Sequence, residues 1–148
     1  QLIHIKLSNG ENKYYKYDRQ NRIIYIKEVY KDKNIYEYFF TYDDENHTKS
    51  ERKIKKNRKT IIFDFTDFYQ YDSDGNIIYT KYYSSIITDS DNKLLSFAIT
   101  EEEYEYDEKG YLSHIKKTSS GKETNKYFEY LFDENDNLKT SVCYEEVE

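Results

Sequence analysis

Aromatic and polar residues alternate along most of this chain, which is the pattern of β-strands with two different faces. In one such stretch, Tyr36, Tyr38, Phe40 and Tyr42 share one face, and Glu37 falls on the other. No segment carries apolar residues at the 3.6-residue spacing of an amphipathic helix. β-branched and aromatic residues, which favour strands, dominate the alternating stretches. The pattern therefore predicts an all-β protein.

Turn-forming residues divide this pattern into about eleven strands joined by short loops, which predicts an antiparallel meander of hairpins. The chain contains no Pro, and this suits uninterrupted hydrogen-bonded ladders. Two architectures remain possible, a curved open sheet and a closed barrel with a filled interior. The predicted strands are Leu2–Leu7, Lys13–Tyr17, Ile23–Tyr30, Ile35–Tyr42, Thr48–Lys55, Lys59–Tyr71, Ile77–Thr88, Leu94–Tyr106, Tyr111–Thr118, Glu123–Phe132 and Leu138–Tyr144.

A four-residue phrase of aromatic, any residue, aromatic and Asp recurs five times. It occupies 15–18, 40–43, 69–72, 104–107 and 130–133. Three residues after each Asp stands a type that tolerates a left-handed backbone, namely Asn21, Asn46, Gly75, Gly110 or Asp136. We expect each strand to end on the aromatics, the Asp to start a tight turn, and the third residue beyond it to take a positive φ.

Equivalent positions of a repeat are expected to pack on equivalent surfaces. The second aromatic of each phrase is therefore expected to be more buried than the average Tyr of the chain. The predicted structural anchors are Tyr17, Asp18, Tyr42, Asp43, Tyr71, Asp72, Gly75, Tyr106, Asp107, Gly110, Phe132 and Asp133.

Composition favours one soluble domain spanning residues 1–148. Charged residues form 35% of the chain, but disorder is excluded because 19 Tyr and 8 Phe recur at strand spacing. The formal net charge of −6 argues against general nucleic-acid binding. No apolar run approaches the roughly 18 residues of a transmembrane segment. Because the chain contains no Met, we expect it to be trimmed at the N-terminus, either after a signal peptide or from a longer repeat array.

The phrase with its turn resembles the YD repeat of bacterial Rhs proteins. The best matches are 71–78 (Tyr-Asp-Ser-Asp-Gly-Asn-Ile-Ile) and 106–112 (Tyr-Asp-Glu-Lys-Gly-Tyr-Leu), and the five phrases together span nearly the whole chain. The units are longer than a typical YD repeat, and most lack the glycines that follow in that family. The resemblance implies a β-strand array with a structural, surface or encapsulating role and no catalysis of its own. The chain also resembles short secreted YD-type proteins of Bacteroidota, and small hairpin-array antitoxins and immunity proteins.

No catalytic or metal site is predicted. His4, His47 and His114 lack metal-ligand spacing, and the chain has neither a nucleophile elbow nor a phosphate-binding loop. Asp72, Asp74 and Asn76 alternate along the chain as the oxygen ligands of a calcium-binding loop do. The twelfth loop position, where such loops place a bidentate acid, is Tyr83. Turn chemistry is the better interpretation, and we expect no cofactor. Cys143 is alone, so no internal disulfide forms.

A cluster of basic residues is the first candidate for partner binding. On a hairpin tip it would attract an anionic glycan or an acidic protein, whereas a solvated tip would need no partner. Exposed Tyr on the longest strands is the second candidate. The cluster consists of Lys49, Arg52, Lys53, Lys55, Lys56, Arg58 and Lys59.

The sequence thus predicts a non-enzymatic secreted or cell-envelope protein with a binding or scaffold role, whose partner is a protein or a glycan. One alternative is a cytoplasmic immunity-type or antitoxin-type inhibitor that presents a sheet face to a toxin. Another is a small ligand-binding barrel or enzyme. The oligomeric state stays open.

Overall fold

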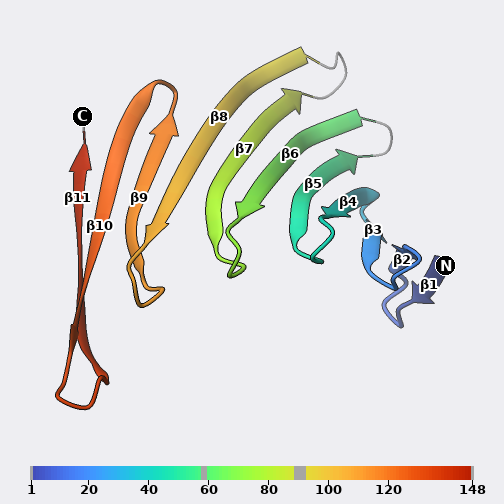
Figure 1. Cartoon of the computed structure of the whole chain (residues 1–148). Helices are drawn as coiled ribbons and strands as arrows, with labels where there is room; N and C mark the ends of the chain where they lie inside the picture. The colour runs from blue at the N-terminus through green and yellow to red at the C-terminus, as the bar shows by residue number, and fades with distance from the viewer. Residues whose placement is uncertain (1, 58–59, 89–92, 148) are drawn as a thin grey trace. The chain divides into compact units, whose positions relative to one another are not determined.

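The computed structural model describes residues 2–57, 60–88 and 93–147, and every regular element among them is a β-strand. Hydrogen-bonded neighbours follow chain order from β1 to β11 (Figure 1), and the described pairs are antiparallel. The predicted meander of eleven strands is confirmed. The strands are β1 (Leu2–Lys6), β2 (Asn12–Tyr17), β3 (Ile23–Val29), β4 (Asn34–Tyr42), β5 (Thr48–Asn57), β6 (Thr60–Tyr71), β7 (Ile77–Thr88), β8 (Lys93–Tyr106), β9 (Leu112–Ser119), β10 (Lys122–Phe132) and β11 (Leu138–Val147).

The sheet is open. β1 and β11 stand at the two ends of the strand order, and the sheet does not close on itself. Of the two architectures that the sequence allowed, the open sheet is the one observed.

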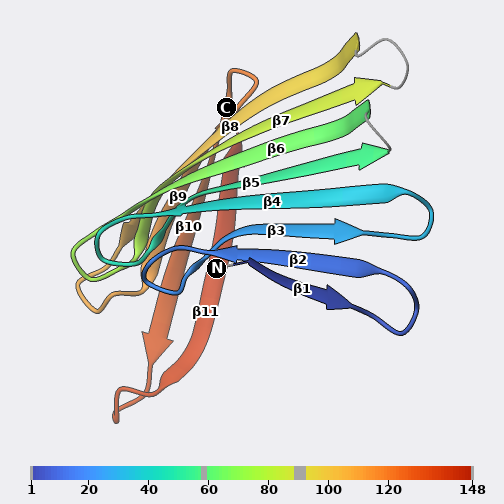
Figure 2. The same ribbon diagram turned by 90° about the vertical axis from the view of Figure 1, so that its right-hand side faces the viewer.

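Internal contacts divide the chain into two compact units. The first contains 1–69 and 82–98, and the second contains 70–81 and 99–148. In the first unit, successive turns alternate between the two ends of the strands (Figure 2). The prediction of one domain over 1–148 stays a prediction.

Five hairpins share one turn, and each is built on the Asp of the repeated phrase. At the third of them, the Asp72 N–H donates to the Asn76 carbonyl at 3.0 Å, and the Gly75 N–H donates to the Asp72 carbonyl at 3.2 Å. One carboxylate oxygen of Asp72 accepts the backbone N–H groups of Asp74 and Asn76, both at 2.9 Å. This is a three-residue loop that ends in a left-handed residue. The Asp side chain holds it closed by accepting N–H groups that the turn leaves free.

The predicted positive φ angles are confirmed at all five positions. They are 68° at Asn21, 74° at Asn46, 85° at Gly75, 80° at Gly110 and 60° at Asp136. The hairpin between β9 and β10 uses a different turn, a two-residue loop in which Ser120 and Gly121 both have positive φ.

Very little of either unit is fully buried. Among the described residues, Ile54 is the one buried hydrophobic side chain, at 5% exposure, and Asn125 is the one buried polar side chain. The described strands belong to one sheet, and their side chains are mostly half-buried or exposed. Contacts between neighbouring strands must therefore stabilise each unit.

Cross-strand ion pairs supply much of that contact. Among them, acidic side chains on β4, β6 and β8 face basic ones on β5, β7 and β9. Pairs joining neighbouring strands are Lys13–Glu28, Lys56–Glu37, Arg52–Asp64, Lys81–Glu101, Lys117–Glu102, Lys116–Glu123 and Lys126–Glu145.

The second aromatics of the five phrases are all half-buried, and none of them is exposed. Two of them also make hydroxyl contacts with a neighbouring strand. The Tyr42 hydroxyl donates to the Ile23 carbonyl at 2.7 Å, and the Tyr106 hydroxyl donates to the Ile77 carbonyl at 2.8 Å. The repeated phrase therefore fixes both its own turn and the adjacent hairpin.

Candidate functional site

The described members of the predicted basic cluster lie along β5. They alternate between the two faces of this strand, because successive side chains of a strand point to opposite sides. Lys49 is exposed near one end of the strand. Arg58 and Lys59 lie outside the described residues.

On one face of β5, lysines lie over aromatic rings. The Lys53 ammonium is 5.8 Å from the ring centre of Tyr36 and 5.5 Å from that of Tyr38. The Lys55 ammonium is 5.5 Å from the ring centre of Tyr36 and 6.0 Å from that of Phe63. These are cation–π distances. Both lysines therefore take part in the packing of their own sheet face.

On the other face, cations pair with carboxylates of the adjacent strands. Lys56 pairs with Glu37, which also accepts the Tyr25 hydroxyl at 2.7 Å. Burial acts to raise the pKa of Glu37, but the hydrogen bonds from Lys56 and Tyr25 outweigh it and lower that pKa. Arg52 holds Asp64 through two nitrogens, with Nε 2.8 Å from Oδ1. Arg52 and Lys56 are thus paired with acids of the neighbouring strands, and the role of the cluster in partner binding stays a prediction.

Three aromatic side chains on the longest strands form a surface that we call the aromatic shelf, namely Phe68 on β6, Tyr83 on β7 and Phe97 on β8. The ring centres of Phe68 and Tyr83 are 5.8 Å apart, and those of Tyr83 and Phe97 are 6.4 Å apart. Phe68 is 42% exposed and Phe97 is 56% exposed. The shelf lies within the first unit, and its two Phe side chains are exposed to solvent.

The aromatic shelf forms one side of an open hollow of about 400 Å³. The paired Arg52 and Asp64, together with Thr66 and Ser85, supply its polar wall. The Ser85 hydroxyl donates to the Asp64 carbonyl at 3.3 Å, which ties β7 to β6 beside the hollow. Apolar rings beside a few fixed polar groups are the usual composition of a ligand-binding site.

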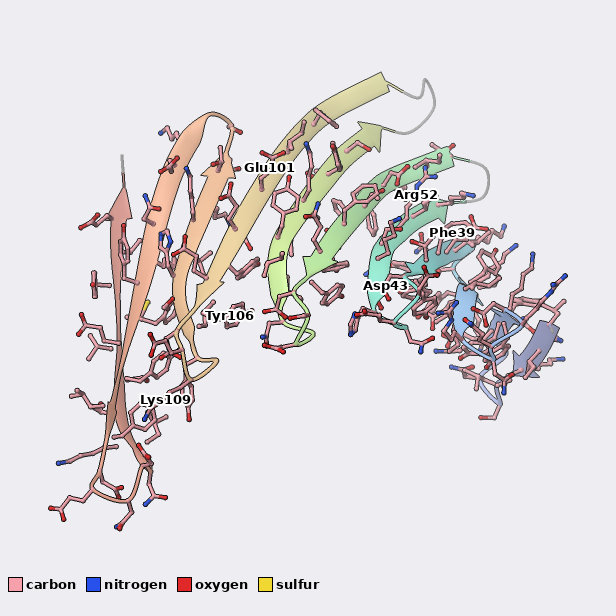
Figure 3. All side chains as sticks on the ribbon, viewed as in Figure 1. Phe39, Asp43, Arg52, Glu101, Tyr106 and Lys109 are labelled. Carbon is pink, nitrogen blue, oxygen red and sulfur yellow. The ribbon has the colours of Figure 1, made fainter. Side chains whose placement is uncertain are left out.

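Phe39 extends the aromatic surface on the far side of Arg52. It lies directly opposite Arg52 in the pairing of β4 with β5, so the two side chains share a face (Figure 3). Phe39 is 38% exposed, and its ring centre is 5.0 Å from that of Tyr25. The polar wall therefore has aromatic side chains on both flanks.

Sequence reasoning named exposed Tyr on the longest strands as a second candidate, whereas the exposed members of the aromatic shelf are Phe68 and Phe97. Phe68, Tyr83 and Phe97 come from three different strands, and their neighbourhood depends on the register of the hairpins between them. A usable signal was present, because each is an aromatic residue well inside one of the three longest strands.

The side chains with metal-binding chemistry are used within the fold. Asp72, at the calcium-like sequence, accepts the Asn76 side-chain amide at 3.0 Å in addition to its two backbone N–H groups. His47 contacts Asp43, and His114 contacts Asn125. Over the described ranges, no group of three or more His, Cys, Asp or Glu is placed to hold a metal ion.

Comparisons with known proteins give no family assignment. No protein-family model matches the chain, and no curated protein matches it. The likeness to YD repeats therefore stays a prediction based on the repeated phrase. Nowhere in the described part is there a helix long and apolar enough to cross a membrane.

Proposed function

We propose that this chain is a non-enzymatic β-repeat protein that binds a protein or glycan partner on one face of its open sheet, with the aromatic shelf as the contact. The repeated hairpins serve as the scaffold. Tyr83 stands at the centre of the contact, and the paired Arg52 and Asp64 at its border fix the orientation of the partner.

The exposure of the aromatic shelf is the observation that carries this proposal. Burying a phenylalanine side chain completely is worth roughly 1.5–3 kcal/mol. Phe68 and Phe97 forgo a large part of that in the free protein, because they are 42% and 56% exposed. Adjacent exposed aromatics are typical of interaction sites, where they contribute disproportionately to affinity.

The location that accompanies this proposal is outside the cell or in its envelope. It is supported by the resemblance of the repeated phrase to surface and secreted YD-type arrays.

Screening on glycan and protein arrays tests the proposal. Three versions are compared, namely the wild type, a Phe68→Ser/Phe97→Ser double variant, and a Leu131→Ser control. Leu131 is 58% exposed and lies in the second unit, so the control changes surface apolarity away from the aromatic shelf. We expect a partner that binds the wild type and the control and loses at least about tenfold in affinity for the double variant. A partner that binds all three versions equally would show that the aromatic shelf is not the contact.

A further inference from the structure

Two hairpins in different units are built from the same sequence elements. The β1–β2 hairpin carries His-Ile-Lys at 4–6 and Asn-Lys-Tyr at 12–14. The β9–β10 hairpin carries His-Ile-Lys at 114–116 and Asn-Lys-Tyr at 125–127. In both, the His and the Tyr are direct cross-strand partners. The two hairpins are therefore structural equivalents, and one can be used to interpret the other.

Their side-chain contacts agree closely. His4 Nε2 is 3.0 Å from Asn12 Oδ1, and its ring stacks on Tyr14 with centres 4.5 Å apart. His114 Nε2 is likewise 3.0 Å from Asn125 Oδ1, and its ring stacks on Tyr127 at 4.7 Å. The equivalence thus extends from the sequence to the geometry of the packed side chains.

The two hairpins differ in what borders their first strand. β9 pairs on its other side with β8, which places Glu105 opposite His114 and Glu103 opposite Lys116. An oxygen of Glu105 is 3.5 Å from His114 Nδ1. β1, in the part of the chain that the structure describes, pairs with β2 alone. Its outer edge is therefore the counterpart of the β9 edge that β8 covers.

The backbone of β1 presents free hydrogen-bonding groups at this edge. Bonding to a neighbour alternates along an antiparallel strand. The Leu7 N–H donates to the Glu11 carbonyl at 2.9 Å, so Ile5 and Ile3 bond towards β2. The N–H and carbonyl groups of His4 and Lys6 consequently face outwards. These two residues are the counterparts of His114 and Lys116, which face acidic residues of β8.

We propose that the outer edge of β1 is a docking edge for an antiparallel strand of alternating acidic and aromatic residues, supplied by a segment that is not part of residues 1–148. In the register of β8 on β9, the incoming acids lie opposite His4 and Lys6, and an aromatic residue lies opposite Ile5. All five residues of β1 are exposed, with Leu2 at 61% and Ile5 at 43%. A docked strand covers these apolar side chains and satisfies the unpaired backbone groups, which is the mode called β-augmentation.

A peptide of residues 99–107, the acidic and aromatic end of β8, is the probe. Its affinity for the intact chain is measured by fluorescence anisotropy, and amide hydrogen exchange of the chain is followed with and without peptide. We expect saturable binding with new protection of the His4 and Lys6 amides. Absence of binding, or protection confined to other strands, would overturn the proposal.

Charge variants test the register. Lys6→Glu should weaken peptide binding at least tenfold, whereas Lys49→Glu, an equal charge change at an exposed lysine of β5, should leave it unchanged. A peptide carrying Glu103→Lys and Glu105→Lys should bind the Lys6→Glu chain more tightly than it binds the wild-type chain. Equal weakening of peptide binding by the two chain variants would show that only the net charge of the chain matters, and would overturn the proposal.

A backbone variant separates edge pairing from side-chain attraction. Lys6→Pro removes an outward N–H, a change that edge strands tolerate. We expect an unchanged circular dichroism spectrum and loss of peptide binding. Retained binding would contradict docking through the backbone. Sedimentation equilibrium of the chain alone is the final control, because dimers that exclude the peptide and dissociate on Lys6→Pro would assign the edge to a second copy and overturn the proposal.

Discussion

The Tyr106 hydroxyl donates a 2.8 Å hydrogen bond to the carbonyl of Ile77, the first residue after the preceding repeated turn. Tyr42 makes the same contact with Ile23, the first residue of β3, at 2.7 Å. In both cases the last aromatic of one phrase is attached to the hairpin that the previous phrase began. The phrase thus links successive repeats as well as closing its own turn.

Removing that hydroxyl should destabilise the protein modestly. For Tyr106→Phe we expect a loss of about 1 kcal/mol in the free energy of unfolding, since one partly buried hydrogen bond is lost and the Ile77 carbonyl is left without it. Urea denaturation measures this. Tyr130→Phe is the control, because its ring contact with Tyr111 survives the change, and it should stay within about 0.5 kcal/mol of the wild type. Equal losses for the two variants would show that the Tyr106 contact has no special role.

The left-handed residue of the repeated turn can be tested at Gly110. Its φ is +80°, and a Cβ added there meets nothing within 4 Å, so backbone strain alone opposes a side chain. Gly110→Ala should cost about 1 kcal/mol of stability. Gly110→Asn should cost less, because Asn21 and Asn46 already occupy the equivalent position at positive φ. Thermal denaturation compares the two variants, and a loss for Asn as large as that for Ala would contradict this account.

Acid should weaken the repeated turns. The hydrogen bond from the Asn76 side chain and those from backbone N–H groups lower the pKa of Asp72 below its usual value. A carboxyl whose pKa is lowered by folding stabilises the protein above its ordinary pKa of about 4, and this contribution is lost as the pH falls through the lowered value. Melting temperature measured from pH 6 down to pH 2 should therefore depend less on pH in Asp72→Asn than in the wild type. Asp74→Asn, an equal charge change in the same turn, is measured in parallel as the control for net charge.

The carboxylate of Asp67, which faces that of Glu51, should behave in the opposite way. The two residues are direct partners in the pairing of β5 with β6. Burial, and then the charge of Glu51, raise the pKa of Asp67. A carboxyl with a raised pKa favours folding below its ordinary pKa, and this contribution is lost as the pH rises through the folded value.

Asp67→Asn should therefore stabilise the protein at pH 7, by up to about 1 kcal/mol. The gain should shrink as the pH falls through the raised pKa of folded Asp67, and it should be smallest below the ordinary pKa of about 4, where the carboxyl is protonated in both the folded and the unfolded protein. Chemical denaturation at pH 7 and at about pH 3 measures the gain in stability. A stabilisation of the same size at both pH values would show that repulsion between the carboxylates is not its cause.

The turns were predictable because their chemistry is local. An Asp followed after three residues by Gly, Asn or Asp contains both the acceptor and the left-handed residue that the loop needs, and alternation fixed the strands between turns. The surroundings of β5 were not predictable in this way. The acids that pair with Arg52 and Lys56 lie on β6 and β4, far from them in the sequence. The basic run itself is divided between the two faces of β5, because successive side chains of a strand point to opposite sides. The aromatic shelf depends on hairpin register for the same reason.

The central claim, a solvent-exposed aromatic shelf that a partner covers, can be tested with a single fluorophore. The chain contains no Trp, so Phe97→Trp introduces one emitter at the aromatic shelf, and Leu131→Trp introduces one in the second unit as a control. Acrylamide quenching is measured with and without the partner identified on the arrays. We predict strong quenching of both variants in the free protein, and protection by the partner of the Phe97→Trp emitter alone. An emitter at position 97 that is already shielded in the free protein, or that stays fully quenchable in the complex, would contradict the account.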